Sequence, residues 1–163
     1  DFIVIYVGSF SQRKGILRLD EAVKKVNDVK VIYIGTGELR PQKGRTIFIG
    51  TLPHHELVNY LNAADVFVLP TLAEGCCNAI IEAMACGLPI ISSDLPFNDD
   101  ILDNENSIRI DSNNIEQIAS AIQYLKDNPE IRLKMGKASL AKAKELTIES
   151  RAKKIIDFIE KNM

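Results

Sequence analysis

Short apolar runs rich in β-branched residues alternate along this chain with segments of helical periodicity, and this alternation limits the fold more than any other feature. The runs are almost continuously apolar, as in strands that helices cover on both faces. Strand–helix units repeated in this order predict a parallel sheet. We expect strands at residues 2–8, 30–35, 46–50, 65–70, 89–92 and 107–110.

The segments between these runs place apolar residues at helical spacing, and capping signals mark some of the helix ends. Asn113 and Glu116 resemble a capping box, and Asn78 is expected to begin a helix that continues through Ala85. The apolar faces that we expect are Ile16, Leu19, Val23 and Val26; Leu57, Leu61 and Ala64; Ile115, Ile118, Ile122 and Leu125; and, after a Thr147 cap, Ala152, Ile155, Ile156 and Ile159. A further helix is expected to begin at Asn128-Pro129.

These patterns predict an α/β, Rossmann-like, doubly wound parallel sheet of about six strands with helices on both faces. The chain of 163 residues is long enough for one continuous core, and we expect a single domain over 1–163. The net charge of −2 argues against nucleic acid or an anionic membrane as a bulk partner. The three cysteines suggest no disulfide framework, so we expect reduced thiols and a cytoplasmic location.

Folds of this kind bind ligands at the carboxyl ends of their strands, which directs attention to the loops there. The first loop runs from Gly8 to Gly15 and carries Arg13 and Lys14 near the start of a helix, as an anion site would. A tight turn with solvated basic residues explains this loop equally well. Neither the G-x-G-x-x-G fingerprint nor the P-loop is present, which argues against a dehydrogenase or a nucleotide-hydrolysing enzyme.

Two further loops offer weaker signals. Gly35 and Gly37 permit a positive φ angle and a close approach of the backbone by a ligand. His54 and His55 are adjacent and point in different directions from a helix start, without a third ligand in register for a metal. We therefore expect capping or solvated histidines and no metal site.

The sequence "LAEGCCNAIIEAMACGLPII" (72–91) places two glutamates where a solvated carboxylate is not expected. Glu74 lies in a loop at the carboxyl end of a strand, and Glu82 lies in an otherwise apolar helical row. A carboxylate in such a row is costly unless it is hydrogen-bonded, and a sugar diol would supply donors. Structurally, Glu82 could instead accept from a loop amide, and Glu74 could favour the helix dipole.

The residues Glu74 and Glu82 are separated by seven others, and "EAMACGLPIISS" begins at the second. Together with "GSFSQRKG", "GTGELR" and "NAADVFVLPT" in this order, the pattern resembles the retaining GT-B glycosyltransferases of the glycosyl transferases group 1 family. Bacterial members of that family include capsular-polysaccharide and lipopolysaccharide sugar transferases. The resemblance extends from Tyr6 to about Ile110, and a compatible helical tail follows.

The resemblance implies a role for each matching residue. Glu82 would bind the ribose hydroxyls of a nucleotide, Glu74 would contact the transferred sugar, and Lys14 would neutralise the diphosphate. Catalytic roles thus fall to Glu74 and Lys14. The other donor-binding positions that it implies are Gly8, Ser9, Arg13, Gly35, Gly37, Thr51, Leu52, Gly75, Cys76, Cys77, Asn78 and Ala79.

The reaction implied is transfer of a sugar from a UDP-, GDP- or ADP-sugar to an acceptor hydroxyl with retention of configuration, in cell-surface polysaccharide or glycoconjugate synthesis. No cofactor and no metal are expected. The family's N-terminal acceptor domain is expected to be absent from this chain, which would leave the isolated domain inactive. The resemblance also allows peripheral association of the full-length enzyme with the inner face of a membrane.

This chain departs from the family pattern at several positions. Ser9 stands where the family usually has an arginine, with Arg13 in the same loop, and Ser107 replaces a frequent glycine. The family often has a Pro-Glu pair in the segment after residue 93, and near that position this chain has Asn98, Asp99 and Asp100 instead. A non-catalytic nucleotide-sugar-binding module and a GT-B-like nucleotide-sugar epimerase are the alternative functions.

Overall fold

The computed structural model describes residues 1–41, 46–75 and 77–161, and its centre is a parallel sheet. In this part of the chain six strands pair in the order β3-β2-β1-β4-β5-β6. Each strand lies within one residue of its predicted bounds at either end, so the predicted fold class is confirmed. The strands are β1 (Phe2–Val7), β2 (Val29–Ile34), β3 (Thr46–Ile49), β4 (Val66–Leu69), β5 (Ile90–Ser93) and β6 (Ser107–Ile110).

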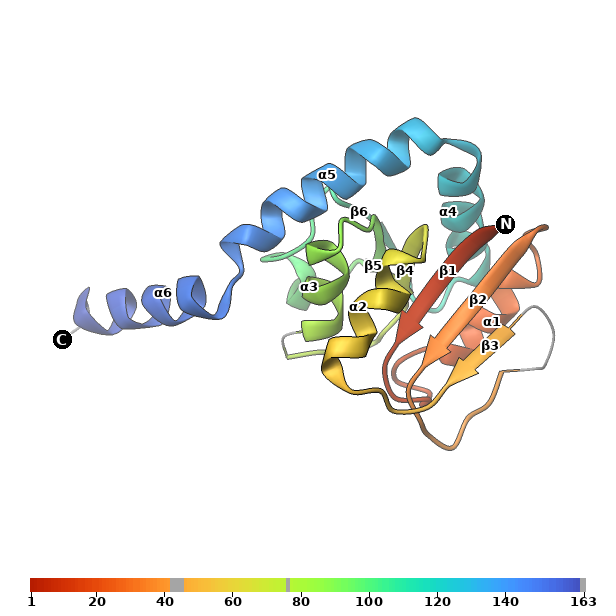
Figure 1. The fold of residues 1–163 in the computed structure, drawn as a ribbon, viewed down its shortest axis with the longest axis horizontal. Helices are drawn as coiled ribbons and strands as arrows, with labels where there is room; N and C mark the ends of the chain where they lie inside the picture. The colour runs from red at the N-terminus through yellow and green to blue at the C-terminus, as the bar shows by residue number, and fades with distance from the viewer. Residues whose placement is uncertain (42–45, 76, 162–163) are drawn as a thin grey trace.

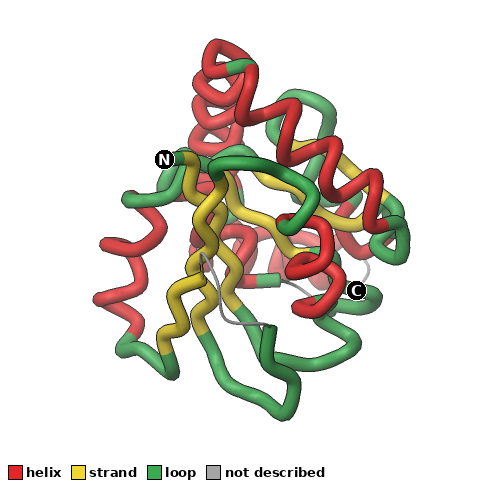
Figure 2. The backbone as a smooth tube through the Cα atoms, turned by 90° about the vertical axis from the view of Figure 1, so that its right-hand side faces the viewer, coloured by secondary structure: helices red, strands yellow, loops and turns green. Residues whose placement is uncertain are grey.

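Helices cover both faces of this sheet (Figures 1 and 2). One layer contains α1 and α4, which pack against each other, and the opposite layer contains α3 and α5, which also pack together. The helices are α1 (Ile16–Val23), α2 (His54–Asn62), α3 (Asn78–Ala85), the 3₁₀ turn η1 (Pro96–Asn98), α4 (Ile115–Asp127), α5 (Pro129–Glu145) and α6 (Ile148–Lys161).

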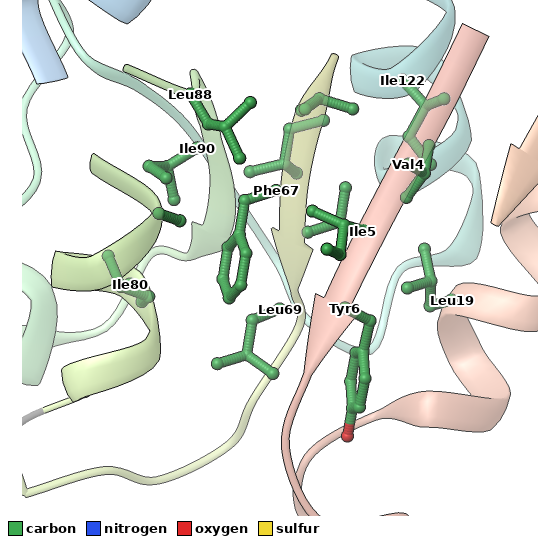
Figure 3. Close-up of a cluster of buried hydrophobic side chains, with 14 of the residues drawn as sticks. Val4, Ile5, Tyr6, Leu19, Phe67, Leu69, Ile80, Leu88, Ile90 and Ile122 are labelled. Carbon is green, nitrogen blue, oxygen red and sulfur yellow. The ribbon is translucent and has the colours of Figure 1, made fainter. Parts of the chain in front are cut away.

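The core is built around the two central strands, β1 and β4. Ile5 of β1 and Phe67 of β4 have no exposed surface, and their strands lie between Ile80 of α3 and Leu19 of α1 (Figure 3). These strands are nearly all apolar because both of their faces are covered. Strand β3 lies at the edge, where Ile47 is 51% exposed, so the expectation of cover on both faces fails for this strand.

The start of α4 differs from the predicted capping box at Asn113 and Glu116. The N-cap is Asn114, whose side chain accepts a hydrogen bond of 3.1 Å from the N–H group of Gln117. The N–H group of Asn113 instead donates to the carboxylate of Asp111 at 2.9 Å. This local turn keeps Asn113 in the loop, so the helix begins one residue later.

Other helix ends agree with the sequence more closely. Pro129 is the first residue of α5, and Thr147 Oγ1 accepts a 3.2 Å hydrogen bond from the N–H group of Ser150 at the start of α6. Helix α1 ends at Val23, so Val26 belongs to the following turn, although it is buried as its apolar character predicts.

Helix α6 projects from the body of the molecule and contains no buried residue (Figure 1). Its predicted apolar face is therefore exposed, with Ile155 61% and Ile159 50% accessible. Within the described ranges, no helix has the length and apolar character that crossing a membrane requires.

Candidate functional site

The carboxyl ends of the strands meet along one edge of the sheet, at the bottom of Figure 1. The strand order makes β1 and β4 neighbours although they are far apart in the sequence, and the loops that follow them lie together. The Arg13 guanidinium donates to the Ala73 carbonyl at 2.5 Å, and the N–H group of Leu72 donates to the Arg13 carbonyl at 2.9 Å. These bonds join the two loops at the position where such folds place ligands.

Lys14 and Glu74 form the charged centre of this contact. Lys14 Nζ lies 2.6 Å from Glu74 Oε1, and the Thr71 hydroxyl donates to the same oxygen at 2.7 Å. The Arg13 guanidinium is 3.7 Å from that oxygen. The side chain of Glu74 is only 9% exposed, so its charge is matched by these partners and not by water alone. Glu74 is thus placed by an ion pair, which neither sequence interpretation of this glutamate included.

A buried set of hydroxyl groups holds this loop from below. The Ser93 hydroxyl donates to the carbonyl of Thr71, and the Ser112 hydroxyl lies 3.1 Å from that carbonyl and 2.6 Å from Ser93 Oγ. All three residues are buried. Sequence reasoning did not single out these residues; the signal available was a pair of serines at the end of an otherwise apolar strand, since buried hydroxyl groups need partners.

Helix α3 begins at Asn78, as predicted, with Cys77 in the N-cap position. The first N–H groups of any helix have no acceptor inside the helix, which makes this end suitable for an anion. Burial raises the pKa of the Cys77 thiol, which is 4% exposed, so the thiol stays protonated at neutral pH. Cys76, the other predicted position in this loop, lies outside the described residues.

A cavity of about 380 Å³ opens beside these loops. It contains five of the predicted donor-binding positions, namely Gly8, Ser9, Gly35, Thr51 and Leu52. The rest of its lining is Val7, Ile34, Thr36, Gly50, His54 and Leu57, so the described lining carries no charge other than that of a protonated histidine.

The glycines near this cavity allow close contacts within the chain itself. Gly35 has a φ angle of +138°, and a Cβ atom built there would lie 2.0 Å from the carbonyl oxygen of Gly8. A Cβ atom on Gly37 would lie 2.4 Å from the carbonyl oxygen of Phe10. The close approach that sequence reasoning assigned to a ligand is therefore made here by the neighbouring loop.

Glu82 lies one turn into α3, and its side chain is 28% exposed. Its Oε1 atom is 2.7 Å from Nε2 of His54, the first residue of α2. Within the chain its partner is thus a histidine side chain and not a loop amide, the structural alternative that the sequence left open. His54 was expected to be a capping or solvated residue; it is 83% exposed but contacts this carboxylate. Its neighbour His55 is 3.9 Å from Glu56.

The remaining predicted positions have separate environments. Ser9 Oγ is 3.2 Å from Ser11 Oγ, and the Ser9 carbonyl accepts a 2.7 Å hydrogen bond from the Tyr6 hydroxyl. Gly75 lines a different cavity of about 490 Å³ between α3 and the start of α6. Ala79 is partly buried and Asn78 is exposed at the start of α3.

The unusual acidic residues after β5 are engaged elsewhere. Asp99 lies 2.6 Å from the guanidinium of Arg109, which is also 3.1 Å from Asp94. Within residues 1–41, 46–75 and 77–161, no group of three His, Cys, Asp or Glu side chains is arranged to hold a metal ion.

Comparison with known proteins identifies one family. The model of the family described as "Glycosyl transferases group 1" matches residues 1–142. A teichuronic acid biosynthesis glycosyltransferase of Bacillus subtilis, TuaC, is 34% identical over 124 residues, covering 74% of this chain and 32% of its own length. The Escherichia coli UDP-Gal:alpha-D-GlcNAc-diphosphoundecaprenol alpha-1,3-galactosyltransferase is 30% identical over 150 residues, covering 81% of this chain and 38% of its own.

Solved structures show the same fold. The sucrose-phosphate synthase of Thermosynechococcus elongatus superposes with a TM-score of 0.86 and 26% identity, covering 99% of this chain and 45% of that one. The Anabaena protein HepE, solved in complex with UDP and glucose, gives a TM-score of 0.87 at 17% identity, covering 99% of this chain and 48% of that one. The chain thus spans 32% to 48% of the length of these proteins.

Proposed function

This chain belongs to the glycosyl transferases group 1 family, and from that premise we propose that it is the nucleotide-sugar-binding part of a glycosyltransferase. In this proposal it corresponds to the C-terminal, donor-binding half of a GT-B enzyme, and the acceptor binds to a separate N-terminal domain. The chain's share of its relatives, 32% for TuaC and 38% for the galactosyltransferase, supports this division. The free thiols of Cys77 and Cys86 favour a cytoplasmic location in this proposal.

The observation that carries the proposal is the meeting of Lys14 and Glu74 beside a glycine-lined cavity at the carboxyl edge of the sheet. The uncharged cavity suits a nucleoside base, which the backbone groups of Thr51 and Leu52 would frame. The start of α3 and the ammonium group of Lys14 suit the diphosphate, since both favour negative charge. Glu82, which is bonded to His54 in the cavity lining, would accept a hydrogen bond from a ribose hydroxyl.

The reaction proposed is transfer of a sugar to an acceptor hydroxyl with retention of configuration, in the synthesis of a cell-surface polysaccharide or glycoconjugate. Lys14 would stabilise the departing diphosphate as its charge develops, which is an electrostatic contribution to catalysis. Glu74 would position the transferred sugar through its hydroxyl groups. The relatives named for teichuronic acid and for diphosphoundecaprenol substrates support a role of this kind.

The experiment that tests the proposal is a calorimetric and thermal-shift titration of this chain with UDP, GDP and ADP, with and without magnesium. A nucleotide at 100 times its dissociation constant should add about 2.7 kcal/mol of stability. Glu82→Ala should weaken binding by about 100-fold and so remove most of the effect. Glu56→Ala, which removes a carboxylate from the exposed side of α2, is the matched control and should leave it unchanged.

Binding of one nucleotide without magnesium, lost in Glu82→Ala alone, supports the proposal. The proposal is wrong if no nucleotide binds at millimolar concentration either to this chain or to the full-length protein that contains it. Binding that persists while Glu82→Ala leaves sugar transfer by the full-length protein unchanged would instead support a non-catalytic module.

A further inference from the structure

We infer that His54 is a positioning residue for the carboxylate of Glu82 and thereby sets the preference of the site for a nucleotide that carries ribose hydroxyls. This inference rests on the proposed function, because it assigns Glu82 to the ribose of the donor. His54 and His55 lie outside the sequence motifs that resemble the family, and this role is inferred from the geometry of His54.

The position of His54 between two parts of the site is the first observation. It is the first residue of α2 and lines the cavity of about 380 Å³ together with Gly8, Gly35 and Thr51. Its Nε2 atom also lies 2.7 Å from Glu82 Oε1 on α3, 28 residues away in the sequence. Among the described residues, His54 is the one that both lines this cavity and bonds to Glu82.

The chemistry of the pair gives His54 a specific effect on Glu82. An Nε2–H group donates to Oε1 in the protonated imidazole and in one of the two neutral tautomers, so the bond does not require a charged histidine. With Oε1 engaged, the carboxylate is fixed in orientation and its Oε2 atom is left to accept from a hydroxyl group. A carboxylate that is oriented before binding loses less entropy when the ribose arrives.

The exposure of the pair argues against a purely structural role. The His54 side chain is 83% exposed, and exposed ion pairs contribute little to folding stability. His55 offers a matched comparison, since it is 82% exposed on the same helix turn but its acidic neighbour Glu56 is 3.9 Å away. Replacing either histidine should therefore leave the fold intact, so a change in affinity in these variants reports on the binding site and not on folding.

The test measures nucleotide affinity by calorimetry for the unmodified chain and for His54→Ala, His54→Gln, His55→Ala, Glu82→Ala and the double variant His54→Ala/Glu82→Ala. The ligands are UDP, GDP and ADP with their 2′-deoxy and 3′-deoxy forms. The deoxy form that binds the unmodified chain more weakly identifies the hydroxyl that Glu82 contacts. Thermal unfolding of each variant checks that the fold is retained.

We expect His54→Ala to weaken binding of the ribonucleotide roughly tenfold, as for the loss of one charge-assisted hydrogen bond. For the deoxynucleotide that lacks the contacted hydroxyl, His54→Ala should have the same affinity as the unmodified chain. His54→Gln, whose amide also donates, should restore most of the affinity, and His55→Ala should match the unmodified chain. The double variant His54→Ala/Glu82→Ala should bind the ribonucleotide with the same affinity as Glu82→Ala.

Different failures have different meanings. If Glu82→Ala loses binding while His54→Ala behaves like His55→Ala, the inference is wrong and the proposed function stands. If His54→Ala weakens ribonucleotide and deoxynucleotide equally, His54 is only part of the cavity wall, and the inference is again wrong. If no nucleotide binds or Glu82→Ala has no effect, the proposed function fails, and this inference fails with it.

Discussion

Lys14 Nζ lies 2.6 Å from Glu74 Oε1, across the contact between the loops that follow β1 and β4. The two groups proposed for catalysis are thus already partners of each other. A diphosphate bound at Lys14 would share this lysine with Glu74, so the carboxylate holds the ammonium group in place at the site.

The Lys14–Glu74 pair should show coupling in folding stability. The two side chains are 14% and 9% exposed, so removing one partner leaves a poorly solvated charge. We expect Lys14→Met to lower the free energy of unfolding by about 1–3 kcal/mol, and Lys14→Met/Glu74→Gln to cost less than the sum of the two single changes. Urea denaturation of the four proteins measures this; additive costs would contradict the coupling.

Lys14 should also discriminate between ligands by their phosphate groups. We expect Lys14→Ala to weaken binding of a nucleoside diphosphate by about 10- to 100-fold, since a charged hydrogen bond is lost, and to leave binding of the nucleoside alone nearly unchanged. Lys25→Ala is the control, because Lys25 is exposed and pairs with Glu116 away from the site. Calorimetry with both ligands gives the result, and an equal loss for both would assign Lys14 to another part of the ligand.

Gly35 should not tolerate a side chain. We expect Gly35→Ala to lower the free energy of unfolding by at least about 2 kcal/mol, because its φ angle of +138° is strained for alanine and the Cβ atom would strike the Gly8 carbonyl. Gly50→Ala is the matched control, since nothing lies within 4 Å of a Cβ atom there. Thermal unfolding of both variants should separate them, and equal melting temperatures would show that the loop moves to make room.

Two buried tyrosines should make the protein sensitive to alkali. Burial raises the pKa values of Tyr6 and Tyr33 far above the ordinary value of 10.0. Above pH 10 the unfolded chain therefore releases these protons while the folded protein keeps them, so each tyrosine lowers stability by about 1.4 kcal/mol per pH unit. Tyr6→Phe should reduce this slope, and Tyr124→Phe, at a 49% exposed position, should not. Urea denaturation at several pH values gives the slopes.

The same two tyrosines should differ at neutral pH. The Tyr6 hydroxyl donates to the Ser9 carbonyl, so Tyr6→Phe should cost about 1 kcal/mol. The buried Tyr33 hydroxyl has no hydrogen-bond partner among the described residues, so Tyr33→Phe should be neutral or stabilising. A large loss of stability in Tyr33→Phe, measured by denaturation at pH 7, would reveal a partner for this hydroxyl.

The strands of the sheet could be predicted from the sequence because each of them is a short, continuous run of apolar residues. The start of α3 at Asn78 was also predicted, since apolar periodicity and the preceding glycine mark it. Edge strand β3 is the exception in burial: its apolar residues resemble those of the central strands, and only the strand order shows that one side has no neighbour.

The site could be predicted only as separate residues. Lys14 and Glu74, like His54 and Glu82, come from loops and helices distant in the sequence, and no local pattern states which cation meets which carboxylate. The apolar helical row around Glu82 suggested a buried carboxylate that needs hydrogen-bond donors. The Glu82 side chain is instead 28% exposed, because its exposure depends on how α3 is rotated against the sheet. The buried serine network was missed because its members, Ser93, Ser112 and the Thr71 carbonyl, come from segments that are distant in the sequence.

The place of β1 in the middle of the sheet also affects when the site can exist. Arg13 and Ala73 are 60 residues apart in the chain, and their loops meet only after β4 has paired with β1. The conformational entropy of closing such a long loop is lost before the contacts between the two loops can stabilise the structure. During synthesis the residues that line the cavity, which lie between Val7 and Leu57, emerge before Glu74 and Glu82. In the proposed function, the part of the site that would face the sugar and the ribose is therefore the last to form.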